Sequence, residues 1–221
     1  QDRKDQPRVA IGAKLMANLI VAAGADRVVG IDFHQLQNQG FFDIPVDHLY
    51  AAPVLVRYFR EKGLDDLVVV APDVGSAKMA RGYARRLKAG FAIIDKRRPA
   101  PNVAEVVNVV GEVDGKTCLL VDDMVDTGGT LVNAVHALLD RGAKAVYAAA
   151  SHPLLSGPAV ERLSQAPLEE LVVTNTIDIP EERRFEKLRI LSVAGLLANA
   201  IQYIHSNESV SALFEVPDEE T

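Results

Sequence analysis

The chain has 221 residues, 48% of them hydrophobic and 24% charged, a composition typical of a globular protein with one sizeable core. Its 30 acidic and 24 basic side chains give a net charge of −6, which argues against a general nucleic-acid binder. No apolar run approaches the roughly 20 residues of a membrane helix, and the one cysteine, Cys118, excludes an internal disulfide, so we expect a cytoplasmic protein with Cys118 in its core.

Short apolar runs alternate along the chain with longer amphipathic stretches. In chain order, we expect strands at residues 27–31, 67–71, 91–95, 117–121, 145–150, 170–174 and 188–193. Helices are expected at residues 13–23, 48–62, 77–88, 130–141, 158–165 and 194–205. The strands are continuously apolar, which indicates burial on both faces and therefore a parallel sheet flanked by helices. The sequence thus predicts an α/β fold.

The strands fall unevenly along the chain, which predicts a boundary near residue 50. Those from 67 to 193 suffice for one doubly wound domain, which we place at residues 51–205 and follow with a tail at 206–221. Residues 1–50 offer one helix and one strand, too little for a domain, so we expect the remnant of a second domain whose earlier part is absent. The chain also begins QDRKDQPR, without Met, which agrees with that expectation.

The most informative segment is VDDMVDTGGT, residues 121–130, which follows an apolar strand. In open parallel sheets, ligands bind beyond the carboxyl ends of the strands, where this segment would lie. Gly128 and Gly129 permit positive φ and let backbone N–H groups converge on an anion. Asp122 and Asp123 are hydrogen-bond acceptors that suit a vicinal diol, and a phosphorylated sugar carries both groups. The alternative is a surface turn with helix-capping acids. There is no P-loop and no GxGxxG fingerprint.

VDDMVDTGGT resembles the ribose-phosphate binding loop of the type I phosphoribosyltransferase fold. The chain as a whole resembles one family with that fold, the ribose-phosphate pyrophosphokinases, through QDRKD, AKLMANL, GADRVVGIDFH, QGFFDIPVDHLYA, PDVG, IIDKRRP, SHPLLSGPA, VVTNTI and NESVSALF. The resemblance implies a phosphoribosyltransferase-like doubly wound parallel sheet plus the remnant of a second similar domain. It also implies an Mg²⁺-dependent enzyme of nucleotide biosynthesis, which transfers the pyrophosphoryl group of ATP to ribose 5-phosphate and releases AMP.

The same resemblance assigns roles to individual residues. The catalytic cations, which neutralise the transferring phosphates, are Lys96 and Arg98. The ribose 5-phosphate ligands are Asp122, Asp123, Asp126, Thr127, Gly128, Gly129 and Thr130. The ATP contacts are Gln1, Asp2 and His34, and the pyrophosphate loop contributes Asp73 and Gly75. The metal-binding set is Asp32, His34, Asp73, Asp43 and Asp47.

Several of these motifs have less specific alternatives when the residues are read alone. The pair Asp32 and His34 is more often part of a polar loop, and the basic triplet 96–98 before prolines is usually a solvated turn. The first five residues fit a frayed polar terminus equally well. Mg²⁺ prefers oxygen ligands, so His34 fits a phosphate contact better than a metal ligand.

Two other functions agree with parts of the pattern. At Ser76 and Met79 the chain departs from the family, which commonly has glycine and arginine there, and this favours a non-catalytic regulatory or assembly relative. A base-using phosphoribosyltransferase fits the acidic loop but not IDFH or QGFFDIPVD. The resemblance further implies a homo-oligomer, a hexamer, with no nucleic-acid or membrane partner. We expect the chain to bind ribose 5-phosphate and, without an upstream segment, to make AMP slowly.

Overall fold

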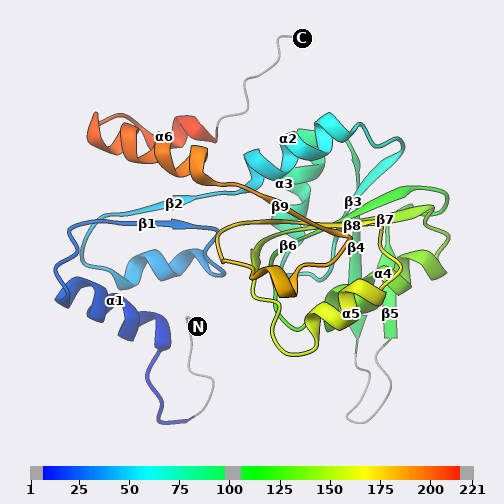
Figure 1. Ribbon diagram of the computed structural model, residues 1–221, viewed down its shortest axis with the longest axis horizontal. Helices are drawn as coiled ribbons and strands as arrows, with labels where there is room; N and C mark the ends of the chain where they lie inside the picture. Colours follow the sequence, from blue (N-terminus) through cyan, green and yellow to red (C-terminus); the bar gives the residue numbers. More distant parts are fainter. Residues whose placement is uncertain (1–6, 98–105, 215–221) are drawn as a thin grey trace. The chain divides into compact units, whose positions relative to one another are not determined.

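The computed structural model describes residues 7–97 and 106–214 (Figure 1). The chain forms two compact units, Gln1–Tyr50 and Ala51–Thr221. The first unit contains α1 (Gly12–Ala22), β1 (Val28–Ile31), the 3₁₀ helix η1 (Leu36–Phe41) and β2 (Val46–Leu49). In this unit β1 and β2 pair in parallel. Two expectations remain predictions. They are that this unit is the remnant of a second domain, and that residues 206–221 form a tail.

The second unit is built on a seven-stranded sheet with the order β5-β4-β3-β6-β7-β8-β9. The strands are β3 (Leu67–Ala71), β4 (Gly90–Arg97), β5 (Val106–Val110), β6 (Thr117–Val125), β7 (Ala145–Pro153), β8 (Glu170–Thr174) and β9 (Leu188–Leu191). The helices are α2 (Ala52–Lys62), α3 (Ala77–Leu87), α4 (Gly129–Asp140), α5 (Ala159–Gln165) and α6 (Ala194–His205), with the 3₁₀ helices η2 (Glu181–Arg183) and η3 (Val210–Leu213). Neighbouring strands are parallel except β4 and β5.

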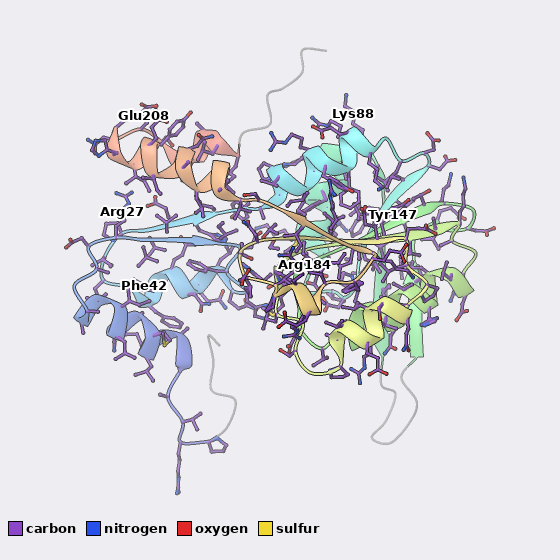
Figure 2. The ribbon with its side chains drawn as sticks, in the orientation of Figure 1. Arg27, Phe42, Lys88, Tyr147, Arg184 and Glu208 are labelled. Atoms are coloured by element: carbon purple, nitrogen blue, oxygen red, sulfur yellow. The ribbon has the colours of Figure 1, made fainter. Side chains whose placement is uncertain are left out.

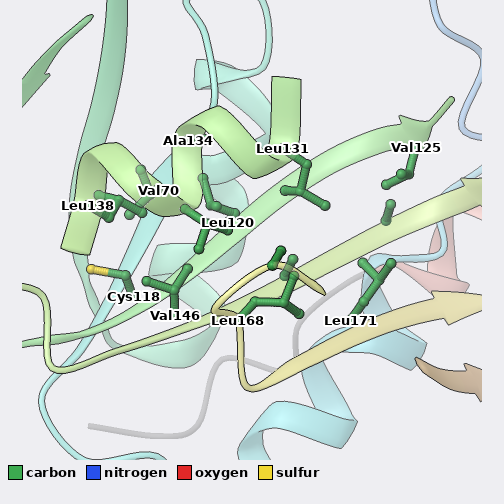
Figure 3. Packing of buried hydrophobic residues seen from close by; sticks show 14 of the residues in the cluster. Val70, Cys118, Leu120, Val125, Leu131, Ala134, Leu138, Val146, Leu168 and Leu171 are labelled. Carbon is green, nitrogen blue, oxygen red and sulfur yellow. The ribbon is translucent and has the colours of Figure 1, made fainter. Parts of the chain in front are cut away.

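Helices cover both faces of this sheet, with α2 and α3 on one face and α4 and α5 on the other (Figure 1). On β6, Cys118 and Leu120 are buried in one cluster with Leu131 and Leu138 of α4 (Figure 3). Leu119 and Val121, which alternate with them on β6, are also buried and lie outside that cluster. Burial on both faces therefore explains the continuously apolar strand, and the expected core position of Cys118 is confirmed.

On the opposite face, aromatic side chains fix α2 to the sheet. The ring of Phe59 meets the ring of Tyr147 edge-on, with centroids 6.4 Å apart. Tyr147, on β7, is labelled in Figure 2. The Tyr58 hydroxyl donates to the Glu170 carboxylate at 2.8 Å, and Lys62 Nζ lies 3.0 Å from the same carboxylate. The expected α/β fold with a doubly wound sheet is confirmed.

Three details of the expected element pattern are wrong. The helix expected from His48 begins at Ala52, because residues 46–49 pair with β1 and Pro53 in the first turn of α2 favours a helix start there. The sequence pattern predicts neither β2, so that the first unit has two strands rather than one, nor β5, which makes one edge of the seven-stranded sheet antiparallel. Strands β6 and β7 continue past their expected ends to Val125 and Pro153, which carries the acidic pair onto a strand rather than into a loop.

Candidate active site

The strand order reverses between β3 and β6, because the chain winds from β3 to β4 on one side and returns to β6 on the other. Ligands of doubly wound sheets bind at such a switch point, beyond the carboxyl ends of the strands. Asp73 follows β3 and Asp122 lies near the end of β6, so both acids are at this switch point. The structure thus brings together two of the predicted site segments that are 49 positions apart in the sequence.

Strand β4 brings a third predicted segment to the carboxyl ends of the strands. Ala71 at the end of β3 pairs with Ile93, and β4 continues to Arg97 in a hairpin with β5. In this hairpin the backbone of Lys96 pairs with Val107, so Lys96 lies beyond the end of β3, on the side where the acids are. The side chain of Lys96 and the whole of Arg98 lie outside the described residues, as do Gln1 and Asp2.

Three carboxylates concentrate negative charge at the switch point. Asp123 is 9% exposed, and its backbone N–H donates to Asp122 Oδ1 at 3.0 Å. Burial, followed by the charges of Asp123 and Asp73, raises the pKa of Asp122 from its ordinary 3.8 to about 7. A cation bound there would relieve this repulsion. Within residues 7–97 and 106–214, no three His, Cys, Asp or Glu side chains have the geometry to hold a metal ion.

The sugar-phosphate loop, residues 126–130, connects β6 to α4. Gly128 is buried and has φ of +73°, a conformation that favours glycine, and a Cβ added to it would lie in a tight contact, 3.1 Å from Leu163 Cγ. Gly129 begins α4 and is not in the left-handed region, contrary to expectation. The loop residues with exposed side chains are Asp126, Thr127 and Thr130. Backbone N–H groups at the start of α4 complete a surface suited to an anion.

The pyrophosphate loop, residues 72–76, is held by its own side chains. The Ser76 backbone N–H donates to Asp73 Oδ1 at 3.0 Å, and the Ser76 hydroxyl lies 3.1 Å from the Asp73 carbonyl oxygen. Gly75 leaves space for this carboxylate, because an added Cβ would lie 3.2 Å from Asp73 Oδ1. In the sequence, Ser76 stands out only because the family commonly has glycine at this position. The structure gives Ser76 a role, which is to orient Asp73.

In the first unit, the segment after β1 carries Asp32 and His34. Asp32 has φ of +41° and donates its N–H to the Leu49 carbonyl oxygen at 2.9 Å. The next N–H, of Phe33, donates to His48 Nε2 at 3.0 Å, and the two rings stack 5.1 Å apart. His34 is exposed. His48 therefore fixes the turn that presents Asp32 and His34, a role that sequence reasoning missed although the motif QGFFDIPVDHLYA contains this histidine.

The two remaining acids predicted to bind metal have other partners. Asp47 receives hydrogen bonds from Arg27 Nε at 2.5 Å and Nη2 at 3.2 Å. Asp47 pairs with Val29, three residues before the level of Asp32, which is about 10 Å along the strands. The fold thus does not bring Asp47 to Asp32. The Asp43 carboxylate is exposed and lies 3.8 Å from Lys14 Nζ.

Comparison with known proteins agrees with this geometry. A family model described as "Phosphoribosyl synthetase-associated domain" matches residues 96–215. Ribose-phosphate pyrophosphokinase of Bacillus subtilis is 56% identical, over 97% of this chain and 68% of that protein. Ribose-phosphate pyrophosphokinase 1 of Listeria monocytogenes is 57% identical over the same shares of each chain. The chain belongs to the ribose-phosphate pyrophosphokinase family.

Structural comparison extends this assignment to the fold. The crystal structure of phosphoribosylpyrophosphate synthetase from Mycobacterium smegmatis matches with a TM-score of 0.86 and 47% identity, over 93% of this chain and 67% of that one. Membership of the ribose-phosphate pyrophosphokinases confirms the family predicted from the motifs. The chain spans about two thirds of the length of these relatives. No helix in the described part of the chain is long and apolar enough to cross a membrane.

Proposed function

We propose that this chain transfers the pyrophosphoryl group of ATP to the anomeric hydroxyl of ribose 5-phosphate, giving 5-phosphoribosyl 1-pyrophosphate and AMP. The observation that carries the proposal is the cluster of Asp73, Asp122 and Asp123 at the switch point, in a chain that belongs to this family. The non-catalytic alternative is less well supported, because the relatives at 55–57% identity are named as the enzyme.

The sugar-phosphate loop would bind ribose 5-phosphate through two kinds of group. The carboxylates of Asp122 and Asp123 accept hydrogen bonds from the vicinal hydroxyls. Backbone N–H groups from Asp126 to Thr130, with the hydroxyls of Thr127 and Thr130, donate to the 5-phosphate. Because backbone N–H groups would face the phosphate, binding depends on the conformation of the loop.

The residues present also fit a divalent cation, which we propose is Mg²⁺. Asp73 and Asp122 would hold it, since burial, followed by the charges of Asp123 and Asp73, raises the pKa of Asp122, and a bound cation would offset that repulsion. When bound, the ion neutralises charge on the transferring phosphates. In the first unit, taken by itself, Asp32 and Asp43 are proposed as ligands of a separate metal ion and His34 as a contact of the ATP phosphates, with Gln1 and Asp2 as further ATP contacts. We also propose a homo-oligomeric, hexameric enzyme.

The transfer itself needs no protein nucleophile. The anomeric oxygen of the sugar attacks the β-phosphorus of ATP and loses its proton to water. The bond from that phosphorus to the oxygen bridging the α- and β-phosphates breaks, and AMP leaves with the electron pair. Cys118 cannot act as a nucleophile, because burial raises its pKa to about 11. Lys96 and Arg98 are proposed to stabilise the charge on the moving group.

The test is a coupled assay for AMP with Mg²⁺, ATP and ribose 5-phosphate. We expect AMP release that requires the sugar and disappears when Asp122→Asn and Asp123→Asn are combined. The variant Asp65→Asn with Asp66→Asn is the control for loss of two adjacent acids, because this other pair is exposed and lies before β3, away from the switch point. Sugar binding without any AMP release would favour the non-catalytic relative and contradict the proposal.

A further inference from the structure

The segment from the end of β7 to the middle of α5 donates hydrogen bonds to the backbone at the start of the sugar-phosphate loop. Three consecutive carbonyl oxygens, at the end of β6 and in the loop, each accept a hydrogen bond from that segment. The bonds run from Leu155 N–H to Val125 O at 3.0 Å, from Ser156 N–H to Asp126 O at 3.0 Å, and from Arg162 Nη1 to Thr127 O at 3.3 Å. We call residues 153–162 the clamp.

The clamp determines where the loop N–H groups point. In a planar trans peptide, the carbonyl of one residue and the N–H of the next point in opposite directions. The described residues contain no cis peptide bond. When the carbonyls of Val125, Asp126 and Thr127 point toward the clamp, the N–H groups of the three residues that follow them point away from it. Those N–H groups belong to the loop, and with the start of α4 they offer donors to an anion.

The clamp is itself held in place. Leu155 is 1% exposed and has φ of +51°, an unusual conformation for a leucine that surrounding contacts must maintain. The Arg183 guanidinium, from η2, donates to the Leu155 carbonyl oxygen. Pro153 lies in register with Val125 at the ends of β7 and β6. The clamp is therefore rigid enough to impose a conformation on the loop.

We propose that Arg162 is a positioning residue for the 5-phosphate, which acts by holding the Thr127 carbonyl and so orienting the Gly128 N–H before ligand binds. The identity of the ligand rests on the function proposed above. Preorganisation lowers the entropy cost of ordering the loop, so its loss reduces affinity without removing a ligand contact. This gives the motif SHPLLSGPA, and the arginine that follows it, a role that the motif alone did not indicate.

The first experiment measures affinity. Arg162→Met keeps the length of the side chain and removes the donor, and we expect the Kd for ribose 5-phosphate and for inorganic phosphate to rise about three- to tenfold, the scale of one hydrogen bond. Arg162→Lys should restore part of the affinity, because it retains a donor. Arg60→Met is the matched control, since Arg60 is also exposed and its guanidinium donates to a backbone carbonyl, that of Arg86, at 2.8 Å. The control should leave both Kd values unchanged.

A second experiment needs no sugar. The amide exchange rates of Leu155 and Ser156, measured by NMR without ligand, should rise in Arg162→Met and not in Arg60→Met, because their N–H groups donate to Val125 and Asp126, the two residues before Thr127. Unchanged exchange and unchanged phosphate affinity in Arg162→Met would overturn the clamp. An equal loss in Arg60→Met would also overturn it. A native chain that binds phosphate but not ribose 5-phosphate would instead contradict the proposed function and leave the clamp standing.

Discussion

The sugar-phosphate loop and the pyrophosphate loop lie at the same edge of one sheet but are held in different ways. The first has its carbonyls bonded by the clamp, about 30 residues away in the chain. The second is held within itself, by bonds from Ser76 to Asp73. The difference follows from what each loop presents. A loop that offers backbone N–H groups must have its carbonyls bonded elsewhere, whereas a loop that offers one carboxylate needs only that side chain oriented.

The largest effect should come from removing the acceptors of the sugar site. Asp122→Asn combined with Asp123→Asn should raise the Kd for ribose 5-phosphate by about 100-fold or more, because each charge-assisted hydrogen bond contributes about 1.5–3 kcal/mol. The pyrophosphate loop keeps its own bonds, so the affinity for pyrophosphate with Mg²⁺ should fall less, through loss of the Asp122 metal ligand alone. Calorimetry with both ligands measures this, and unchanged sugar affinity would show that the diol binds elsewhere.

A second variant tests whether the rate of transfer can fall without any change in ligand binding by the two loops. Lys96→Ala should lower kcat by about 100-fold, the scale of one preorganised electrostatic contact in a transition state. The affinity for ribose 5-phosphate should hardly change, because neither loop is touched. Lys144→Ala, an exposed lysine immediately before β7, is the control for loss of a positive charge. Equal losses in kcat and affinity would mean that Lys96 supports ground-state binding or structure.

A third prediction tests the charge that the two loops share. The folded chain holds the Asp122 proton more tightly than the unfolded chain, because its pKa is raised from 3.8 to about 7. Ionising Asp122 between about pH 4 and pH 7 therefore destabilises the fold. Without divalent cations, Asp122→Asn should gain about 1–3 kcal/mol of unfolding free energy relative to the native chain over that range. Urea titrations at pH 4, 5.5 and 7.5 measure it, and a constant difference would contradict the pKa shift.

The smallest effect concerns the bonds within the pyrophosphate loop. Ser76→Ala removes the hydroxyl but keeps the backbone N–H that donates to Asp73, so the affinity for pyrophosphate with Mg²⁺ should fall only about two- to fivefold. The Kd for ribose 5-phosphate should not change. Ser164→Ala, which removes a hydroxyl bonded to the Glu161 carbonyl on α5, is the control. A loss of sugar affinity in Ser76→Ala would show that the two loops are not independent.

The difference between a loop held by neighbouring residues and one held by distant residues also explains what the sequence could predict. VDDMVDTGGT was interpretable because its strand, acids, glycines and helix start are contiguous. The ion pair of Arg27 and Asp47 joins residues 20 apart, and the clamp bonds join residues about 30 apart, so neither leaves a local pattern. Strand β5 was missed for a related reason. Its valines are apolar enough for a strand, but its antiparallel pairing with β4 is a tertiary choice.

The buried thiol has a practical consequence for studying both loops. Cys118 is the sole cysteine of the sequence, is fully buried under α4, and has its pKa raised to about 11. Maleimides near neutral pH should therefore leave it unmodified. A cysteine introduced at Val74, which is 68% exposed beside Asp73, would be the single reactive thiol of the chain. A fluorophore attached there could report ligand binding at the pyrophosphate loop in real time, without first removing any native cysteine.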